Sequence, residues 1–330
     1  MRILVTGACG RIGAHVVRQL AARGHEVAGI DSVVHAGNLR DMAGRTSISA
    51  VDVQDLAGLL RAVQQERAQC IIHLAAAIGD QYDRQPWGSY QVNLGGTLNV
   101  LEAARFAGVG RVVAASTHNI YPRAYGPYGP PEWRPIAEDH PHDPHRPYAV
   151  MKLAGEYMGR IYSDDLALDF GAVRFASYYG AERAIRRGRK FPDLLNRMIL
   201  DAVEGTSTTI ERGGEQVFDP VYIKDCAHGV ICAALNDSPL QGAVYNIGGG
   251  RPVTIREAAA TVRRVIPTAQ ISVGPGETYA ADGALHHPAL DISRARRELG
   301  YEPQFGLEAG IADCARELRD LIAGAFRPAG

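Results

Sequence analysis

The sequence predicts an α/β protein built on a parallel sheet with helices wound over both faces. In the first half of the chain, short apolar runs alternate with longer stretches of helical periodicity, which is the pattern of successive βαβ units. After Arg174 this alternation ends, so we expect a smaller α/β lobe there. With 330 residues, 46% of them hydrophobic, the chain is long enough for a large core divided between two lobes.

Six strands and four helices are predicted in the first half from its apolar runs and helical periodicity. The strands are expected at Ile3–Val5, Glu26–Ile30, Ser47–Val51, Cys70–Leu74, Arg111–Ala115 and Leu168–Arg174. The helices are expected at Arg11–Ala22, Asp55–Gln65, Trp87–Ala107 and Tyr148–Asp164. The third helix is rich in Leu, Ala and Val over Val92–Phe106, which favours a contact between subunits.

The second half is predicted to return to the sheet and then to form the smaller lobe. Its helices are expected at Asp193–Val203, Ile223–Leu235, Thr254–Val265 and from Leu307, and its strands at Thr208–Glu211, Val217–Val221, Val244–Ile247 and Gln270–Val273. We assign residues 1–175, with returning segments near 217–248, to the sheet domain, and 176–216 and 249–330 mainly to the smaller lobe. Tyr121–Pro147 is rich in Pro and Tyr and is predicted to be a long loop, a kind of segment that is commonly functional.

Composition and charge exclude several classes of protein. The formal net charge is −1, so no overall field favours nucleic acid or an anionic membrane. No apolar run approaches the ~20 residues of a membrane span, and Met1 leads directly into the first predicted strand, which leaves no room for a signal peptide. The five cysteines are scattered without metal-ligand spacing, so we expect reduced thiols, no metal site and a cytoplasmic protein.

A glycine-rich turn follows the first predicted strand. Gly7, Gly10 and Gly13 are spaced three residues apart between that strand and a predicted helix, the context in which a turn places a pyrophosphate on a helix N-terminus. The first glycine permits the tight turn, the second lets backbone N–H groups approach phosphates, and the third allows close helix–strand packing. In this position, the motif predicts a dinucleotide-binding domain of the Rossmann type.

Acidic residues at two strand ends bear on which dinucleotide binds. Asp31 ends the second strand, close to the ~20-residue offset at which an acid binds the ribose 2′-hydroxyl. A carboxylate there repels a 2′-phosphate, and no arginine immediately follows, so NAD is favoured over NADP; a solvated strand-end acid is the alternative. Asp52 ends the third strand and either accepts a hydrogen bond from the adenine amino group or caps the next helix. The small side chains of Leu74–Ala77 suit a backbone that passes close to a cofactor.

Tyr148 and Lys152 lie one turn apart on one face of a predicted helix. Oxidation of a secondary alcohol requires a base with a pKa near neutrality, whereas tyrosine titrates near pH 10. A positive charge about 4 Å away, at an effective dielectric of about 20, contributes on the order of 4 kcal/mol, or roughly three pKa units. Lys152 supplies such a charge, so Tyr148 is the predicted base. An exposed Tyr–Lys helix pair is the alternative, and the preceding glycine turn argues against it.

Polar residues elsewhere complete the predicted site. Ser116 and Thr117 follow the fifth strand at the carboxyl edge of the sheet, where ligands bind, so a hydroxyl there can hold the substrate oxygen. Asn93 either ties the site to a proton-relay water or fixes the adjacent helix. The structural alternatives are that Ser116 and Thr117 cap a turn and that Asn93 caps a helix.

These motifs occur together in the order found in a known family. They are Thr6-Gly7-x-x-Gly10-x-x-Gly13, Asp31, Asp52, His73-Leu74-Ala75-Ala76, Asn93, Ser116-Thr117, Tyr148-x-x-x-Lys152, Val244-Tyr245-Asn246-Ile247-Gly248-Gly249-Gly250 and Asp291-Ile292-Ser293-x-Ala295-x-x-x-Leu299-Gly300-Tyr301. Over essentially its whole length the chain resembles the extended short-chain dehydrogenase/reductase family, also called the NAD-dependent epimerase/dehydratase family. The resemblance implies tightly held NAD, Tyr148 as acid/base, Lys152 on the nicotinamide ribose, Thr117 as the hydroxyl that hydrogen-bonds the substrate, and a dimer built on paired helices.

The chain departs from the family's pattern where the substrate is expected. His118-Asn119 stand where sugar-nucleotide dehydratases usually carry Asp-Glu, which disfavours dehydration. Ser177 stands where sugar-nucleotide epimerases typically have Asn, and Phe218 where they tend to have an Arg that grips the diphosphate. Since Phe218 cannot pair with a phosphate, a substrate without a nucleotide is favoured. The basic run 183–190 either replaces that Arg, binds a substrate carboxylate or phosphate, or is a solvated face.

The sequence therefore predicts an NAD-dependent dehydrogenase or epimerase that oxidises a secondary alcohol of a sugar or sugar-acid type substrate. The alternative is a redox-neutral UDP-sugar 4-epimerase, and a remote one is a non-catalytic NAD-binding regulatory protein. The predicted catalytic residues are Thr117, Tyr148, Lys152 and Asn93. The predicted cofactor contacts are Gly7, Gly10, Arg11, Ile12, Gly13, Asp31, Asp52, Val53, Leu74, Ala75, Ala76, Asn93, Tyr148 and Lys152. The predicted substrate contacts are Ser116, Thr117, His118, Asn119, Tyr148 and Ser177.

Overall fold

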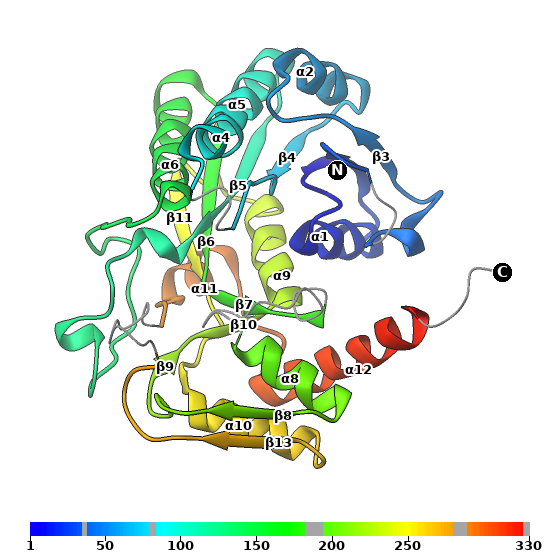
Figure 1. The fold of residues 1–330 in the computed structure, drawn as a ribbon. Coiled ribbons are helices and arrows are strands. Elements are labelled where there is room, and N and C mark those ends of the chain that lie inside the picture. Colours follow the sequence, from blue (N-terminus) through cyan, green and yellow to red (C-terminus); the bar gives the residue numbers. More distant parts are fainter. Residues whose placement is uncertain (35–37, 80–83, 182–193, 280–288, 326–330) are drawn as a thin grey trace.

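A seven-stranded parallel sheet forms the centre of the molecule (Figure 1). The computed structural model describes residues 1–34, 38–79, 84–181, 194–279 and 289–325. The strand order is β11-β6-β5-β4-β1-β2-β3, and every neighbouring pair is parallel. The strands are β1 (Arg2–Thr6), β2 (Glu26–Asp31), β3 (Ser47–Ala50), β4 (Cys70–His73), β5 (Arg111–Thr117), β6 (Asp169–Phe175) and β11 (Ala243–Ile247). The predicted parallel α/β fold is confirmed.

Helices cover both faces of the sheet (Figure 1). On one face α1 (Arg11–Ala22) packs against α9 (Ile223–Ala234), and α11 (Ser293–Leu299) lies beside β11. On the other face α2 (Leu56–Gln65) packs on α5 (Gly96–Ala107), which in turn packs on α6 (Pro147–Leu166). Successive residues of a strand point to opposite faces, so Ile3 and Val5 enter the core beneath α1 and α9, whereas Leu4 enters the core beneath α2 and α5.

A third core lies in the C-terminal part of the chain. It joins α8 (Leu194–Glu204), α10 (Ile255–Val265) and α12 (Leu307–Ala325) with the parallel pair β8 (Ser207–Ile210) and β13 (Gln270–Val273). α10 buries Ile255, Ala258, Ala259 and Val262, the spacing of an amphipathic helix with one apolar face. This core lies in the part of the chain after Arg174, where the sequence predicts a smaller lobe.

The single helix predicted at Trp87–Ala107 is interrupted. α4 (Pro86–Tyr90) leads into a π-helical turn, η2 (Gln91–Gly95), before α5 begins. In this wide turn, the Asn93 side chain bonds the backbone N–H and C=O of Ala77, and Thr97 donates to the Asn93 carbonyl oxygen. The Thr97 hydroxyl thus occupies the carbonyl oxygen of Asn93, four residues earlier in the helix, and a π-turn of this kind is frequent near functional sites.

The strand predicted at Val217–Val221 is two strands, and β7 and α11 were not predicted. β9 (Val217–Phe218) pairs antiparallel with β12 (Val253–Thr254), and β10 (Pro220–Tyr222) pairs parallel with β7 (Ser177–Tyr179). The break falls at Asp219, whose carboxylate accepts hydrogen bonds from the backbone N–H groups of Gly249 and Leu290. These bonds bend the chain at Asp219, so that β9 pairs with β12 and β10 pairs with β7. The apolar pattern of the sequence does not show this change of partner strand.

The segment predicted as the loop Tyr121–Pro147 is packed against the protein. It contains the short turn η4 (Gly126–Tyr128), and the rings of Tyr128 and His140 meet edge to face with centroids 4.6 Å apart. The Ile136 N–H donates to the Ala289 carbonyl at 2.8 Å, which ties the loop to the C-terminal part of the chain. No helix in the described ranges is long and apolar enough to cross a membrane.

Candidate active site

The glycine turn lies between β1 and α1 and leaves no room for side chains. Gly7 has φ +67°, and a Cβ there would lie 2.7 Å from the Ala75 nitrogen. A Cβ on Gly13 would lie 2.1 Å from the Gly7 carbonyl oxygen, so α1 approaches the turn as closely as backbone allows. Gly10 precedes the first helical residue, and the first-turn N–H groups of a helix are free to bind an anion.

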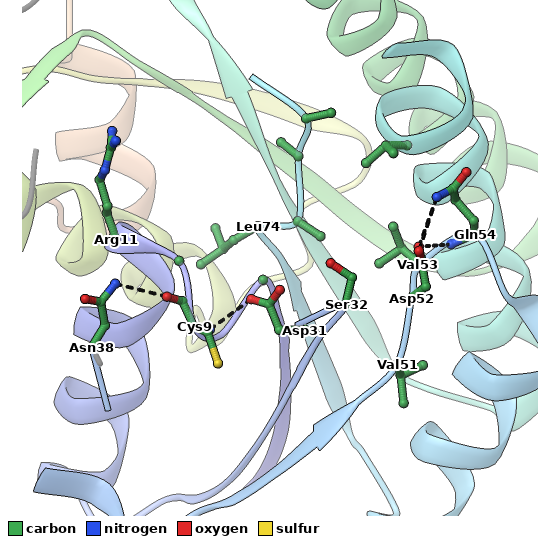
Figure 2. A pocket seen from close by; sticks show the side chains of 16 residues that line it. Cys9, Arg11, Asp31, Ser32, Asn38, Val51, Asp52, Val53, Gln54 and Leu74 are labelled. Atoms are coloured by element: carbon green, nitrogen blue, oxygen red, sulfur yellow. Dashed lines mark hydrogen bonds between the residues drawn. The ribbon is translucent and has the colours of Figure 1, made fainter. Parts of the chain in front are cut away.

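A cavity of about 450 Å³ opens over this turn at the carboxyl ends of β1, β2 and β4 (Figure 2). Figure 2 shows Arg11 and Asn38 at one end and Asp52 and Val53 at the other. The predicted cofactor residues that line it are Gly7, Gly10, Arg11, Asp31, Asp52, Val53, Leu74, Ala75 and Ala76. Ile12 instead packs against the apolar cores. The bare backbone, the helix N-terminus and the acid at the end of β2 fit a dinucleotide.

Asp31 is held toward the turn, and Asp52 is not a helix cap. The Asp31 Oδ2 atom accepts from the Cys9 N–H at 3.0 Å, which fixes the carboxylate at the cavity wall. Asp55 caps α2 by accepting from the Gly58 N–H at 3.0 Å. Asp52 Oδ1 accepts from the Gln54 N–H at 2.9 Å, so the capping alternative for Asp52 is wrong, and its carboxylate stays at the cavity wall.

A chain of hydrogen bonds runs beneath the cavity through the fully buried His73. Thr97 donates to the Asn93 carbonyl at 2.7 Å, so its oxygen accepts from His73 Nε2–H at 3.1 Å. His73 Nδ1 must then accept from the Thr6 hydroxyl at 2.8 Å. Burial, and next the nearby Lys152, lower the pKa of His73 to about 3. The imidazole is therefore neutral, with its proton on Nε2, and it ties β1 to β4 and α5.

The Asn93 side chain holds the surrounding backbone in place and does not face an open site. Its amide binds Ala77 through two bonds of 3.0 and 2.9 Å and donates to Ser89 Oγ at 3.0 Å, and its side chain is buried. Of the two roles predicted for Asn93, fixing the adjacent structure fits this geometry, because both amide hydrogens are used. The backbone that it holds, Ala77, lines the cavity.

Tyr148 and Lys152 begin α6, one turn apart. The Lys152 Nζ atom lies 6.0 Å from the centroid of the Tyr148 ring, and the Lys152 side chain is buried. Burial lowers the pKa of Lys152 to about 8, and the carboxylate of Glu156 opposes that shift. Lys152 is therefore charged at neutral pH and shielded from water. An ammonium stabilises a neighbouring tyrosinate most strongly when little water lies between the two charges.

The residues that follow β5 are positioned by short local bonds. Thr117 is buried, and its Oγ1 accepts from the Asn119 N–H at 3.2 Å, which leaves its hydroxyl hydrogen to be donated elsewhere. The His118 Nδ1 atom lies 2.7 Å from the Phe175 carbonyl oxygen; because a carbonyl only accepts, this nitrogen carries the proton. Ser177 lies on β7, next to the end of β6. The basic run 183–190 lies outside the described residues.

Ser116 does not face the expected substrate position. Its hydroxyl donates to the buried carboxylate of Glu156, whereas Thr117, the next residue of the strand, points to the opposite side. The prediction that Ser116 contacts the substrate is therefore wrong for this geometry, and the earlier alternative of a turn cap does not describe it either. Glu156 and its partner Arg174 were missed, although Glu156 follows Lys152 by four residues, the spacing that places both on one helical face.

Comparison with known proteins matches this architecture. A model of the NAD dependent epimerase/dehydratase family matches residues 3–248. The chain belongs to this family. It is 32% identical to the UDP-glucose 4-epimerase of Mycolicibacterium smegmatis, over 97% of this chain and 99% of that protein. It is 30% identical to the dTDP-glucose 4,6-dehydratase of Streptomyces griseus, over 94% and 92%. The solved UDP-glucose 4-epimerase of Thermus thermophilus in complex with NAD has a TM-score of 0.78 and 28% identity, and covers 97% of this chain and 99% of its own.

Membership in the family confirms the predicted resemblance and the predicted cofactor. The protein is an NAD-dependent enzyme of the extended short-chain dehydrogenase/reductase class. The glycine turn, Asp31 and the cavity wall are the residues that fit NAD here. In the described part of the chain, no group of three or more His, Cys, Asp or Glu side chains is placed to hold a metal ion.

Proposed function

We propose that this enzyme oxidises a secondary alcohol of a sugar or sugar-acid type substrate, with Tyr148 as the base. The observation that carries the proposal is the buried Lys152 ammonium beside Tyr148, on a helix that starts at the carboxyl edge of the sheet. NAD, when bound, supplies the acceptor for the hydride of the alcohol carbon. The smaller lobe, with residues 176–216 and 249–330, is proposed to bind the substrate.

Each side chain has a role that follows from its chemistry. Tyr148 takes the hydroxyl proton of the substrate, because the Lys152 charge stabilises the tyrosinate. Lys152 also faces the position of the nicotinamide ribose, as the family resemblance implies. Thr117 donates its hydroxyl hydrogen to the substrate oxygen, and His118 and Asn119 are proposed to contact the other hydroxyl groups of the substrate. Ser177, which begins β7, is proposed to do the same.

The position expected to grip a diphosphate holds no cation. Phe218 lies in β9, is buried at 8% exposure and packs in the core of the smaller lobe. The next residue, Asp219, is committed to two backbone N–H groups and carries the wrong charge for a phosphate. This arrangement supports a substrate that lacks a nucleotide diphosphate.

A second candidate, the redox-neutral UDP-sugar 4-epimerase, is supported by relatives. The M. smegmatis and T. thermophilus proteins are named as UDP-glucose 4-epimerases. An epimerase uses the same base and the same cofactor, but the keto sugar turns within the site and is reduced on its other face. The two candidates therefore differ in the nucleotide handle and in whether NADH accumulates, not in the role of Tyr148.

Calorimetric titration of the NAD-loaded protein with UDP, GDP, CDP and dTDP separates these candidates. We expect no binding by any of the four, followed by NADH formation when free sugars and sugar acids are screened. Micromolar binding by one of them would support the nucleotide-sugar epimerase and exclude the preferred substrate class.

We also propose a homodimer built on α6 and its neighbours. Val150, Tyr157 and Ile161 lie along one face of α6 and are 43%, 51% and 46% exposed, and Trp87 of α4 and Phe106 of α5 are exposed as well. An apolar stripe of this kind is typical of a helix that packs on another subunit. Sedimentation analysis is expected to give a dimer, and Tyr157→Glu a monomer; a monomeric wild-type protein would contradict the proposal.

A further inference from the structure

Three buried polar side chains, Glu156, Arg174 and Ser116, are joined by hydrogen bonds next to Lys152 along α6. Glu156 is one helical turn beyond Lys152 and two turns beyond Tyr148, so all three share one face of α6. Glu156 is 8% exposed and Arg174 of β6 is 1% exposed. Charged side chains are rarely buried this deeply unless they are paired with an opposite charge and fully hydrogen-bonded. The hydrogen-bond partners of both groups account for this burial.

All five N–H groups of Arg174 have an acceptor. Nε donates to Glu156 Oε1 at 3.0 Å, and Nη2 donates to Glu156 Oε2 at 2.6 Å and to His142 Nε2 at 3.2 Å. Nη1 donates to the Tyr121 hydroxyl oxygen at 2.7 Å and to the Glu138 carbonyl at 2.9 Å. A guanidinium offers five donors in a fixed plane, so Arg174 can occupy only this one orientation here.

The Glu156 carboxylate is held as firmly as its partner. Arg174 binds both of its oxygens in the bidentate arrangement, and the Ser116 hydroxyl donates to Oε1. The carboxylate is therefore anchored to Ser116 of β5 and Arg174 of β6. Its negative charge still acts on Lys152 through space, because little water lies between buried groups.

We propose that Glu156, clamped by Arg174 and Ser116, is a positioning residue that keeps Lys152 charged and directed toward Tyr148. The inference rests on the proposed role of Tyr148 as the base. It assigns to the Ser116 hydroxyl, which the sequence placed on the substrate, a function in holding this carboxylate. Tyr148 and Lys152 remain the groups that touch substrate and cofactor.

The charges around Lys152 agree with this role. Burial lowers the pKa of Lys152 to about 8, and Glu156 is the group that counters this effect. His73, on β4, lies near enough for Lys152 to lower its pKa further, and it is neutral. Tyr148, on the same helix, gains stability as a tyrosinate from the ammonium. Arg174 is paired with Glu156, and His142 Nε2 accepts a hydrogen bond from Arg174 Nη2.

The test is an ultraviolet titration of Tyr148 in the NAD-loaded protein. The spectrum of each variant is recorded against the same variant carrying Tyr148→Phe, so that the difference reports only the ionisation of Tyr148. In Glu156→Gln, Lys152 loses its countercharge and deprotonates at lower pH, and we expect the pKa of Tyr148 to rise by about one unit or more. The acid limb of the pH–rate profile is expected to move to higher pH by a similar amount.

Three further variants keep the result interpretable. Glu156→Asp keeps the negative charge, although the protein is expected to be less stable, and should leave the pKa of Tyr148 near the wild-type value. The double variant Glu156→Gln with Arg174→Met removes both buried charges. It replaces the single variant if an unpaired guanidinium prevents that protein from folding, and the pKa of Tyr148 is again expected to rise. Glu102→Gln is the matched control, because Glu102 accepts a hydrogen bond from Tyr162 at the far end of α6; it is expected to change nothing at Tyr148.

The outcomes separate this inference from the proposed function. A wild-type Tyr148 that titrates below its ordinary range, and does not shift in either variant that lacks the carboxylate, overturns the role of Glu156 alone. Equal shifts in Glu156→Asp and Glu156→Gln would also overturn it, because they indicate a purely structural effect. A wild-type Tyr148 that titrates near pH 10 contradicts the proposed function itself, and so does full activity of Tyr148→Phe.

Discussion

At the glycine turn beneath the cofactor cavity the chain presents bare backbone, whereas next to Lys152 it presents the buried charged pair Glu156 and Arg174. A Cβ on Gly7 would collide with the Ala75 backbone, and a Cβ on Gly13 would collide with the Gly7 carbonyl oxygen. Glu156 and Arg174, by contrast, are large side chains locked by bidentate pairing. The glycine turn depends on the absence of side chains, whereas the Glu156–Arg174 pair depends on hydrogen bonds between side chains. Substitutions in the two regions should therefore affect cofactor binding and catalysis differently.

The largest difference is expected for Tyr148→Phe, which affects only the catalytic side. Removing a general base costs roughly 10²–10⁴-fold in rate, so turnover should fall at least about a hundredfold. The cavity residues are untouched, and calorimetry should show NAD affinity within about twofold of the wild type. Retained turnover would show that another group takes the proton.

Gly13→Ala is expected to damage the cofactor side through the backbone. Its Cβ would lie 2.1 Å from the Gly7 carbonyl oxygen, and neither atom belongs to a side chain that can move. We expect urea denaturation to show a loss of about 2–4 kcal/mol, with weaker NAD binding. Gly88→Ala is the matched control, because a Cβ there meets open space; a loss of similar size at Gly88 would contradict the steric argument.

Lys152→Met should separate function from stability. Burial lowers the pKa of Lys152 to about 8, below the ~10.4 of an unfolded lysine, so the unfolded chain binds more protons between these values and wild-type stability rises with pH through that window. The variant should lose turnover yet gain about 2 kcal/mol of stability at pH 7. That gain should shrink as the pH rises from 8 toward 10, as urea denaturation at several pH values can measure; a constant gain would contradict the sign.

Asp31→Asn is expected to have the smallest effect. The amide keeps an oxygen that can accept from the Cys9 N–H, as the carboxylate does at 3.0 Å, but it loses the charge that binds a ribose hydroxyl and repels a 2′-phosphate. NAD affinity should fall about tenfold, and the preference over NADP should narrow. A fluorescence competition between the two cofactors measures both, and an unchanged preference would assign the selectivity elsewhere.

The same contrast explains what the sequence could predict. The glycine turn, Asp31 and the Tyr148–Lys152 pair are local patterns, and the parallel sheet follows from apolar runs that alternate with helical periodicity. The network around Arg174 joins residues as far apart as 116, 156 and 174, so no local spacing identifies it apart from Glu156 one turn after Lys152. Ser116 was misassigned for that reason: at a strand end, successive side chains point to opposite sides, and only the three-dimensional partner shows which of two hydroxyls faces the substrate.

The most direct measurement is the ultraviolet titration of the wild-type NAD-loaded protein against Tyr148→Phe, which needs no knowledge of the substrate. The account predicts one tyrosine that ionises well below pH 10 and is absent from the variant. If the two titrations coincide below pH 10, Tyr148 is not poised as a base, and the proposed mechanism is wrong.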